Sequence, residues 1–321
     1  MQPGLPAEEA SVVGLTAGAT AAAPGEAEAL AAEARTQRCA WGGEDCSSLR
    51  CCNQGGMQCF RKNEYHSGCR ASCEALDEAG EAWSCESLGG FRDVRELAPA
   101  PEGAPTIGTS LFCFAGALPG SAEEGLIGSQ RERGQGIFAC EDSALYPTDY
   151  TGKGEWQSVV NTDVFIRVWE RVLADGRYSL HDWAVKVDPD TVFHPQRLRD
   201  HLAALRAPAG ASVYVKNTRF KFGMQGSLEI LSRQALDDYA DGSSGCSSNI
   251  GHEGGEDFYL VQCLDGIGVA HMLDDSMLDD KYTYDHDYDM GDLSFCGSGV
   301  AAAYHPVKDA WAWTECHEMG R

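Results

Sequence analysis

The feature that most constrains the fold of this chain is the crowding of its cysteines near one end. Eight of the 14 cysteines lie within residues 39–85, and the other six are spread over residues 113–316. Such a density is typical of small disulfide-stapled scaffolds and is hard to keep as free thiols in a reducing compartment. Both counts are even, so each region can close its own disulfides. We therefore expect the secretory pathway or the outside of the cell over the cytosol.

Zinc binding is the competing interpretation of the same cysteines. Cys51 and Cys52 are adjacent and the chain holds several histidines, but paired C-x2-C knuckles do not occur. Structural zinc sites usually draw their ligands from such pairs, so disulfides are the favoured prediction.

The composition changes along the chain and predicts its organisation. Residues 1–36 are rich in Ala, Gly, Glu and Pro without an aromatic residue, which predicts a disordered linker or stalk. Residues 37–86 form the Cys-rich module, residues 87–106 a second, Pro-bearing linker, and residues 107–321 the main domain. The start lacks the basic and apolar run of a signal peptide, and no stretch reaches the roughly 18 apolar residues of a membrane span. Membrane attachment would therefore need an anchor absent from this sequence.

The net charge limits the kind of partner. The chain has 25 Lys and Arg against 49 Asp and Glu, a formal net charge of −24. Phosphate backbones would be repelled outside a local pocket, so nucleic acid is not an expected partner.

The main domain alternates apolar runs with amphipathic ones. Strands are predicted over residues 111–115, 136–140, 183–187, 212–215 and 268–273. Helices are predicted from the capping box Ser121 to Glu124 onward and over residues 161–174, 195–205, 232–239 and 256–264. This alternation predicts an α/β layered sheet with its sites at the carboxyl ends of strands.

The sharpest local motif is Asp188-Pro-Asp190, directly after the predicted strand at 183–187. Two carboxylates separated by one residue can hold a hard divalent cation through oxygen. An isolated Asp-x-Asp is also a common turn sequence, and Asp-Pro favours turns. The motif therefore indicates a metal site only together with the sequence around it.

That context resembles Fringe-like and β-1,3-galactosyltransferase-like enzymes, which are inverting nucleotide-sugar glycosyltransferases of the GT-A fold. The resemblance is carried by residues 182–192, by the run Gly251-His-Glu-Gly-Gly-Glu-Asp-Phe-Tyr-Leu, and by Ala303-Tyr-His-Pro. Residues 226–232 look like the family's Gly-bearing acceptor loop, which would include Gly226. The order of these landmarks matches the family over most of the main domain.

The resemblance implies a metal-dependent inverting transfer from a nucleotide diphosphate sugar, such as a UDP-sugar, to a hydroxyl of a glycan or glycoprotein, in the Golgi lumen. It implies that Asp190 and His305 bind Mn²⁺ or another divalent cation, with Asp188 contacting the ribose or the metal. Asp257 is then the expected base, with Glu256 as its rival. The alternative is that Glu256 and Asp257 only stabilise the dipole at the start of their helix. His305 would then have a structural role.

Two further acids are assigned to the donor. Glu141 and Asp142 follow the predicted strand at 136–140, and we expect them to contact the nucleoside.

The Cys-rich module has a resemblance of its own. The spacing Cys59-x3-Asn63-x-Tyr65-x3-Cys69 resembles the small cellulose-binding modules of secreted cellulases, and the cysteine pattern also looks like a cystine knot. Aromatic rings can stack on sugar faces, so Trp41 and Tyr65 are candidate sugar-binding residues. The alternative is that these rings fill a very small core.

Two other functions stay open from the sequence. Asp188 and Asp190 also resemble the start of haloacid dehalogenase-type phosphatases, with Asp188 as a covalent nucleophile and Asp274-Asp275 as a second acidic pair. The other alternative is a non-catalytic secreted carbohydrate-binding protein.

Overall fold

The computed structural model describes residues 39–320, apart from residues 42–43, 54–56, 71, 78–79, 90–95, 150–159, 284–288 and 290. The stalk predicted at 1–36 and part of the linker predicted at 87–106 therefore lie outside the described residues. Among the helices in the described part, none combines the length and the hydrophobicity needed to cross a bilayer.

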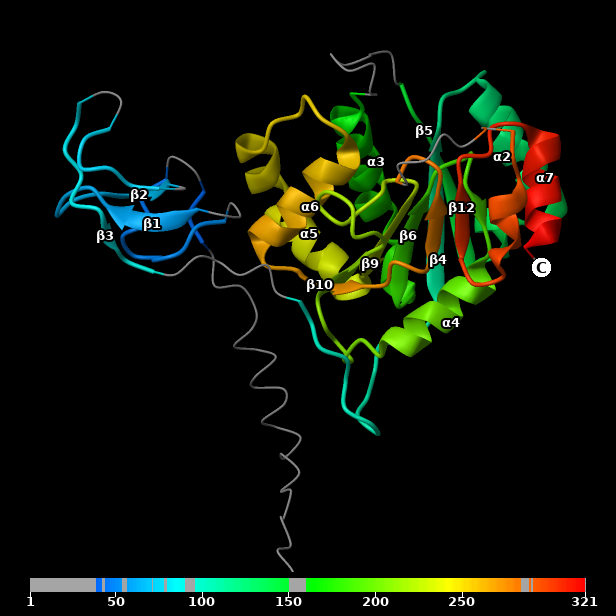
Figure 1. Ribbon diagram of the computed structural model, residues 1–321, viewed down its shortest axis with the longest axis horizontal. Coiled ribbons are helices and arrows are strands. Elements are labelled where there is room, and N and C mark those ends of the chain that lie inside the picture. Colours follow the sequence, from blue (N-terminus) through cyan, green and yellow to red (C-terminus); the bar gives the residue numbers. More distant parts are fainter. Residues whose placement is uncertain are drawn as a thin grey trace, which may run out of the picture. The chain divides into compact units, whose positions relative to one another are not determined.

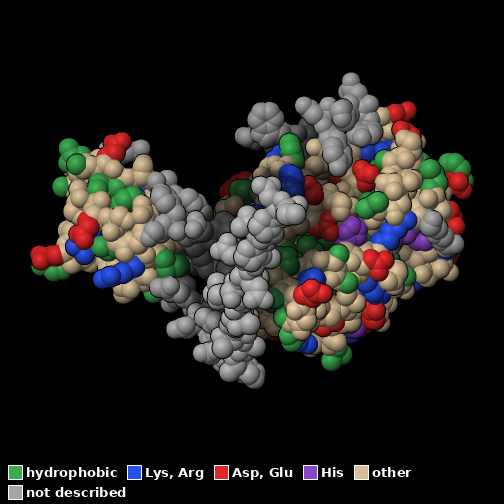
Figure 2. Space-filling view, turned by 60° about the horizontal axis from the view of Figure 1, so that its bottom comes forward, with side chains coloured by type: hydrophobic (Ala, Val, Ile, Leu, Met, Phe, Trp, Pro, Cys, Tyr) green, Lys and Arg blue, Asp and Glu red, His purple; other side chains and the backbone are tan. Residues whose placement is uncertain are grey.

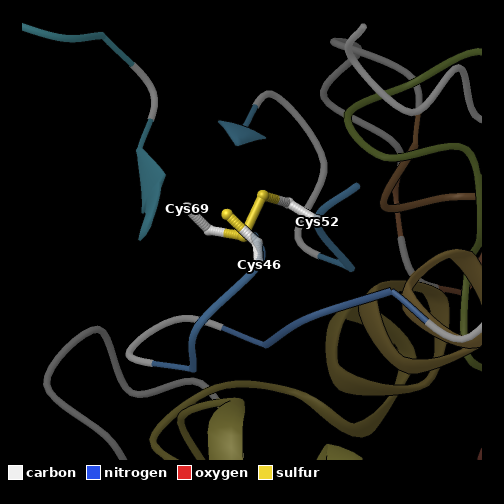
Figure 3. A group of neighbouring side chains, drawn as sticks. All are labelled: Cys46, Cys52 and Cys69. Carbon is white, nitrogen blue, oxygen red and sulfur yellow. A yellow bond between two sulfur atoms is a disulfide. The ribbon is translucent and has the colours of Figure 1, made fainter. Parts of the chain in front are cut away.

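All 14 cysteines are paired in seven disulfides, and the disulfide prediction is confirmed. Four bridges close the Cys-rich module: Cys39–Cys51, Cys46–Cys59, Cys52–Cys69 and Cys73–Cys85. Three close the main domain: Cys113–Cys140, Cys246–Cys263 and Cys296–Cys316. Figure 3 shows three sulfurs of the module gathered at one point, with Cys52 and Cys69 joined directly. Because these sulfurs are committed to disulfides, this cluster is not a zinc site.

The module is built on a small antiparallel sheet. Its strands are β1 (Gln58–Arg61), β2 (Ser67–Arg70) and β3 (Glu86–Ser87), in the order β2-β1-β3. The hairpin between β1 and β2 is closed by Asn63, whose side-chain oxygen accepts hydrogen bonds from the backbone of Tyr65 and His66. The module's own buried cluster consists of Ala40 and three half-cystines, so covalent bonds replace most of a hydrophobic core.

The main domain is built on a six-stranded mixed sheet, in the order β10-β8-β9-β6-β4-β5 (Figure 1). The strands are β4 (Leu111–Ala117), β5 (Asp142–Pro147), β6 (Trp183–Val187), β8 (Val213–Lys216), β9 (Leu228–Ser232) and β10 (Ala270–Leu273). Strands β4, β5 and β6 are parallel, as are β8 and β10, while β9 runs antiparallel to β6 and β8. The parallel pairs need crossovers, which the helices supply.

Helices cover both faces of this sheet. Helices α3 (Thr162–Asp175), α5 (Arg233–Asn249) and α6 (Glu256–Ile267) pack on one face. Helices α2 (Ala122–Arg133), η1 (Gly136–Ala139) and α4 (Pro195–Leu205) pack on the other. The predicted α/β layered fold with a disulfide-rich N-terminal module is confirmed.

The side-chain alternation of β4 explains why both faces are covered. Phe112 and Phe114 point into the core under α3, α5 and α6, whereas Leu111, Cys113 and Ala115 point into the opposite core. A strand whose successive side chains are all apolar must bury both of its faces, as in other parallel sheets.

A second, smaller sheet packs beside the first. It consists of β7 (Val192–Phe193), β11 (Leu278–Asp280) and β12 (Ala303–His305), in the order β11-β12-β7. The short helix η3 (Ser294–Ser298) and α7 (Ala310–Met319) complete this region and are joined by the Cys296–Cys316 bridge. The 3-10 helix η2 (Arg177–Leu180) precedes β6.

Two of the predicted elements differ from the structure. Residues 136–140, predicted as a strand, form η1, because Gly136 has a positive φ and Cys140 bonds to Cys113 on the neighbouring strand. The strand predicted there is β5, a few residues later. Residues 228–232, assigned to an acceptor loop, form β9 at the centre of the sheet, so only Gly226 and its neighbours remain as a loop.

Candidate active site

A cavity of about 510 Å³ lies at the carboxyl ends of β4, β5 and β6. In open α/β sheets, this edge is where ligands bind. The amino-terminal ends of α2 and α3 and the segment after β12 complete the walls. The lining includes Gly116, Glu123, Thr148, Asn161, Phe165, Asp188, Asp190, His305 and Lys308.

The predicted metal ligands converge at one wall of this cavity. One ligand atom from each of Asp188, Asp190 and His305 lies within 4.8 Å of the others. His305 Nε2 is 3.5 Å from Asp190 Oδ1. Asp188 and Asp190 sit in the turn after β6, and His305 ends β12, so the two sheets meet at this point. Two carboxylates and one imidazole form a donor set that suits Mn²⁺.

Asp280 is a site residue that the sequence reasoning missed. Its Oδ2 lies 2.5 Å from His305 Nδ1, and its other oxygen accepts hydrogen bonds from the backbone of Tyr282 and the hydroxyl of Thr283. Asp280 is buried on β11, next to β12. A carboxylate on Nδ1 fixes the imidazole orientation and leaves Nε2 facing Asp190, which is the arrangement that metal-binding histidines use. The parallel pairing of Asp280 with His305 could not be read from the sequence.

Lys186 is the second missed residue, and it is fully buried. Its ammonium lies 2.8 Å from Asp188 Oδ1 and 2.8 Å from Glu256 Oε1, and it donates to the Gly226 carbonyl at 2.6 Å. Burial favours the neutral amine, but the nearby carboxylates, Asp188 and Glu256 first and then Glu229, outweigh it and hold the Lys186 pKa above its ordinary value. Lys186 thereby connects the metal motif to the start of α6. The period of two along β6 places it on the same side as Asp188.

Glu256 and Asp257 open α6 but have different surroundings. Glu256 is buried against Lys186; burial opposes its ionisation, yet the ammonium holds its pKa below the ordinary value. Burial and the Glu256 charge raise the pKa of Asp257 to about 6. Gly226 approaches both acids closely enough that a Cβ there would contact them. Of the two acids, Glu256 is the one that forms an ion pair with Lys186.

Glu123 and Lys308 are further cavity residues that the sequence reasoning did not single out. Burial, and then the nearby charge of Asp190, raise the pKa of Glu123. Lys308 Nζ lies 3.8 Å from Asp190 Oδ2, and its side chain is mostly exposed. The cavity thus combines an acidic wall suited to a cation with an exposed positive charge, Lys308, at its rim.

Glu141 and Asp142 are not brought to this cavity. They lie at the start of β5, whereas the cavity borders the end of that strand. Glu141 pairs with Arg199 and Asp142 with Arg177. The structure gives both acids a role in joining surface elements.

The acidic pair that a phosphatase would use is also elsewhere. Asp274 binds the ring of His201 at 2.7 Å, and Asp275 pairs with Arg219. Neither residue lines the cavity beside Asp188.

The two aromatic residues singled out in the Cys-rich module are placed differently. Trp41 is 7% exposed and packs with the cluster under α5 and α6, whereas Tyr65 is 82% exposed at the tip of the β1–β2 hairpin. Tyr65 is therefore the one of the two with a ring face open to solvent.

The described surface carries charged side chains of both signs. On the face shown in Figure 2, acidic and basic side chains of the described residues are interspersed, without a continuous basic surface.

No protein-family model matches the sequence, and no curated protein is significantly similar to it. Among solved structures, the chain is similar to one described as "crystal structure of a glycosyltransferase involved in the glycosylation of the major capsid of PBCV-1". The identity is 10% and the TM-score 0.40, over 64% of this chain and 98% of that one.

Proposed function

We propose that this protein is a metal-dependent inverting glycosyltransferase of the Fringe-like, GT-A type. In this proposal it transfers a sugar from a nucleotide diphosphate sugar, such as a UDP-sugar, to a hydroxyl of a glycan or glycoprotein. The observation that supports this most is one connected arrangement: Asp188, Asp190 and His305 form the metal wall of the 510 Å³ cavity, and Lys186 joins Asp188 to Glu256. Asp257 follows Glu256 at the start of α6, and both acids lie outside the cavity lining.

The donor set and its support fit a divalent cation. Asp188, Asp190 and His305 would hold it, and Asp280 orients the imidazole. When bound, such a cation stabilises the negative charge that develops on the leaving diphosphate. Lys308 at the rim adds a positive charge for the phosphates.

Asp257 is the residue to accept the proton from the acceptor hydroxyl. Inversion in a single displacement needs a base opposite the leaving group, and the metal-binding acids are committed elsewhere. Glu256 is held by Lys186, so its part is to fix the position of that lysine and of the loop at Gly226.

The seven disulfides favour an oxidising compartment, in agreement with a lumenal or extracellular enzyme. The Golgi lumen is part of the proposal.

The direct test is to incubate the protein with Mn²⁺ and a panel of nucleotide sugars and to measure nucleoside diphosphate release. Asp190→Asn and His305→Ala should abolish release and weaken Mn²⁺-dependent donor binding while the fold survives. Asp200→Asn, which changes an exposed acid on α4, is the matched control. Donor binding that is undiminished in EDTA would contradict the metal-dependent part, and a trapped aspartyl phosphate at Asp188 would favour the phosphatase instead.

The Cys-rich module has a separate proposed role as a glucan-binding module, and the exposed Tyr65 supports it. Replacing Tyr65 with Ala should reduce retention on insoluble cellulose, whereas Leu76→Ala, at another exposed apolar side chain of the module, should not. Equal retention of the unmodified protein and of both variants would indicate a purely structural module.

A further inference from the structure

A second cavity, of about 400 Å³, lies beyond the carboxyl end of β8. Its walls come from the last residue of β8, the loop over residues 217–227, a partly buried face of α6 and strand β10. It shares no lining residue with the cavity of the proposed donor site.

Three cations line this second cavity: Lys216, Arg219 and Lys221. Such a concentration is unusual in a chain with 49 acidic and 25 basic residues. Arg219 pairs with Asp275 in an exposed bridge, which contributes little energy and can exchange for another anion. Among the residues that the structure describes, no carboxylate lies within 4 Å of the Lys216 or Lys221 ammonium. These two charges are available to a ligand.

The remaining lining suits a sugar rather than a bare anion. Glu96, Gln262 and Asp265 offer acceptors for hydroxyl groups, and Asp265 already accepts the Tyr214 hydroxyl at 2.9 Å. Phe222 offers an apolar ring for the carbon face of a pyranose. Cations, hydrogen-bond acceptors and one ring together match a sugar that carries a negative group.

The position of this cavity relates it to the proposed base. Residues 258, 261, 262 and 265 follow the helical spacing of one face of α6, and the last three line the cavity. Phe258, next to Asp257, packs edge-to-face on Phe222 with ring centroids 5.3 Å apart. Gln262 is five residues beyond Asp257, about 7.5 Å along the helix axis and about 140° around it, so Phe258, about 100° from Asp257, lies between the two. An acceptor whose reacting hydroxyl lies at Asp257 would thus pass over Phe258 and Phe222 into the cavity.

We propose that this cavity is an acceptor subsite that binds an anionic sugar residue, with its carboxylate or sulfate group held by Lys216 and Lys221. This inference rests on the proposed function for its link to Asp257, but the binding of the anionic sugar does not depend on transfer. Charge-assisted hydrogen bonds would select such an acceptor over a neutral one of the same shape.

Binding calorimetry with defined oligosaccharides tests the proposal on the full chain. The probes are a tetragalacturonate, its carboxyl-reduced neutral counterpart, and a sulfated galactan tetramer. We expect the tetragalacturonate or the sulfated tetramer to bind at least about tenfold more tightly than the neutral counterpart, since one charged hydrogen bond is worth about 1.5–3 kcal/mol. The stronger of the two anionic probes identifies the anionic group.

The double variant Lys216→Gln/Lys221→Gln should lose this preference. The double variant Arg133→Gln/Arg233→Gln removes the same charge outside the cavity lining and should keep it. Thermal unfolding checks that both variants fold. Equal binding of charged and neutral probes, or an unchanged preference in the lysine variant, would overturn the proposal.

Nucleotide-sugar binding, measured separately, tests the proposed transferase function independently of the proposed anionic-sugar subsite. If donor binds but neither anionic probe does, the subsite is wrong and the proposed function stands. If an anionic probe binds through the lysines but no donor binds, the anionic-sugar site stands and the transferase proposal fails.

Discussion

Asp280 can control the chemistry of His305, because its carboxylate lies 2.5 Å from His305 Nδ1 and is itself held by backbone and hydroxyl donors. Replacing Asp280 with Asn should leave Nδ1 without its anionic partner and should weaken Mn²⁺ binding about 10–100-fold. Calorimetric titration with Mn²⁺ in the absence of donor measures this. Asp279→Asn, at the neighbouring position of β11, is the control and should bind Mn²⁺ like the unmodified protein. Equal losses in the two variants would mean that strand β11, and not the His305 contact, is what matters.

The pKa of the Asp257 carboxyl determines the pH dependence that we expect for transfer. Its pKa is raised to about 6, by burial and by the Glu256 charge. A base works only when ionised, so the transfer rate at saturating Mn²⁺ should be constant above this pKa and should fall about tenfold per pH unit below it. Asp257→Asn should lower transfer by about 10²–10⁴ and remove this limb, while donor binding remains. Measuring kcat/KM from pH 5 upward, at about half-unit steps, tests both statements. If the rate of the Asp257→Asn variant still falls below about pH 6, the titrating group is another residue.

At the scale of elements, β6 and the start of α6 are held together by the buried Lys186. Lys186→Met should destabilise the fold by about 3–5 kcal/mol, because it leaves Glu256 buried without its counter-charge. Adding Glu256→Gln should restore part of that free energy, since the uncompensated charge is then gone. Urea unfolding measures these values, and Lys308→Met, at an exposed lysine, should change the free energy of unfolding by less than about 1 kcal/mol. No recovery in the double variant would show that Lys186 acts through packing alone.

The element scale also shows what the sequence could predict. Strand β6 and helix α4 were predicted with the bounds that the structure has, because each combines an unbroken apolar pattern with a clear end signal, such as Pro195 at the helix start. Strand β9 was missed because Gly226 and Ser227 suggested a loop, and only its pairing with β6 and β8 makes it a strand. Likewise Asp188 and Asp190 stand out locally, whereas Asp280 and Lys186 become site residues only through contacts between distant segments.

At the scale of the whole molecule, the Cys-rich module and the main domain are stabilised in different ways. The main domain buries two extensive apolar clusters on either side of its sheet, whereas the module's own cluster is mostly half-cystines. Each module bridge closes a loop with a sequence separation of 12 to 17 residues, which contributes about 3 kcal/mol in the loop-entropy account. Four such contributions are comparable to the entire stability of a small domain.

Stepwise reduction should therefore open the disulfides of the Cys-rich module before the buried disulfides of the main domain. Cys73 and Cys85 are only half-buried, so we expect them to react with iodoacetamide first as dithiothreitol is raised, followed by the other module bridges. The Cys246–Cys263 and Cys296–Cys316 pairs are fully buried and should react last, because the reductant reaches them only when the main core opens. Mass spectrometry of alkylated peptides gives the order, and nucleotide-sugar binding followed in the same samples should survive the loss of the module. Labelling of Cys246 or Cys296 before Cys73 would mean that the main domain depends on its disulfides more than its core implies.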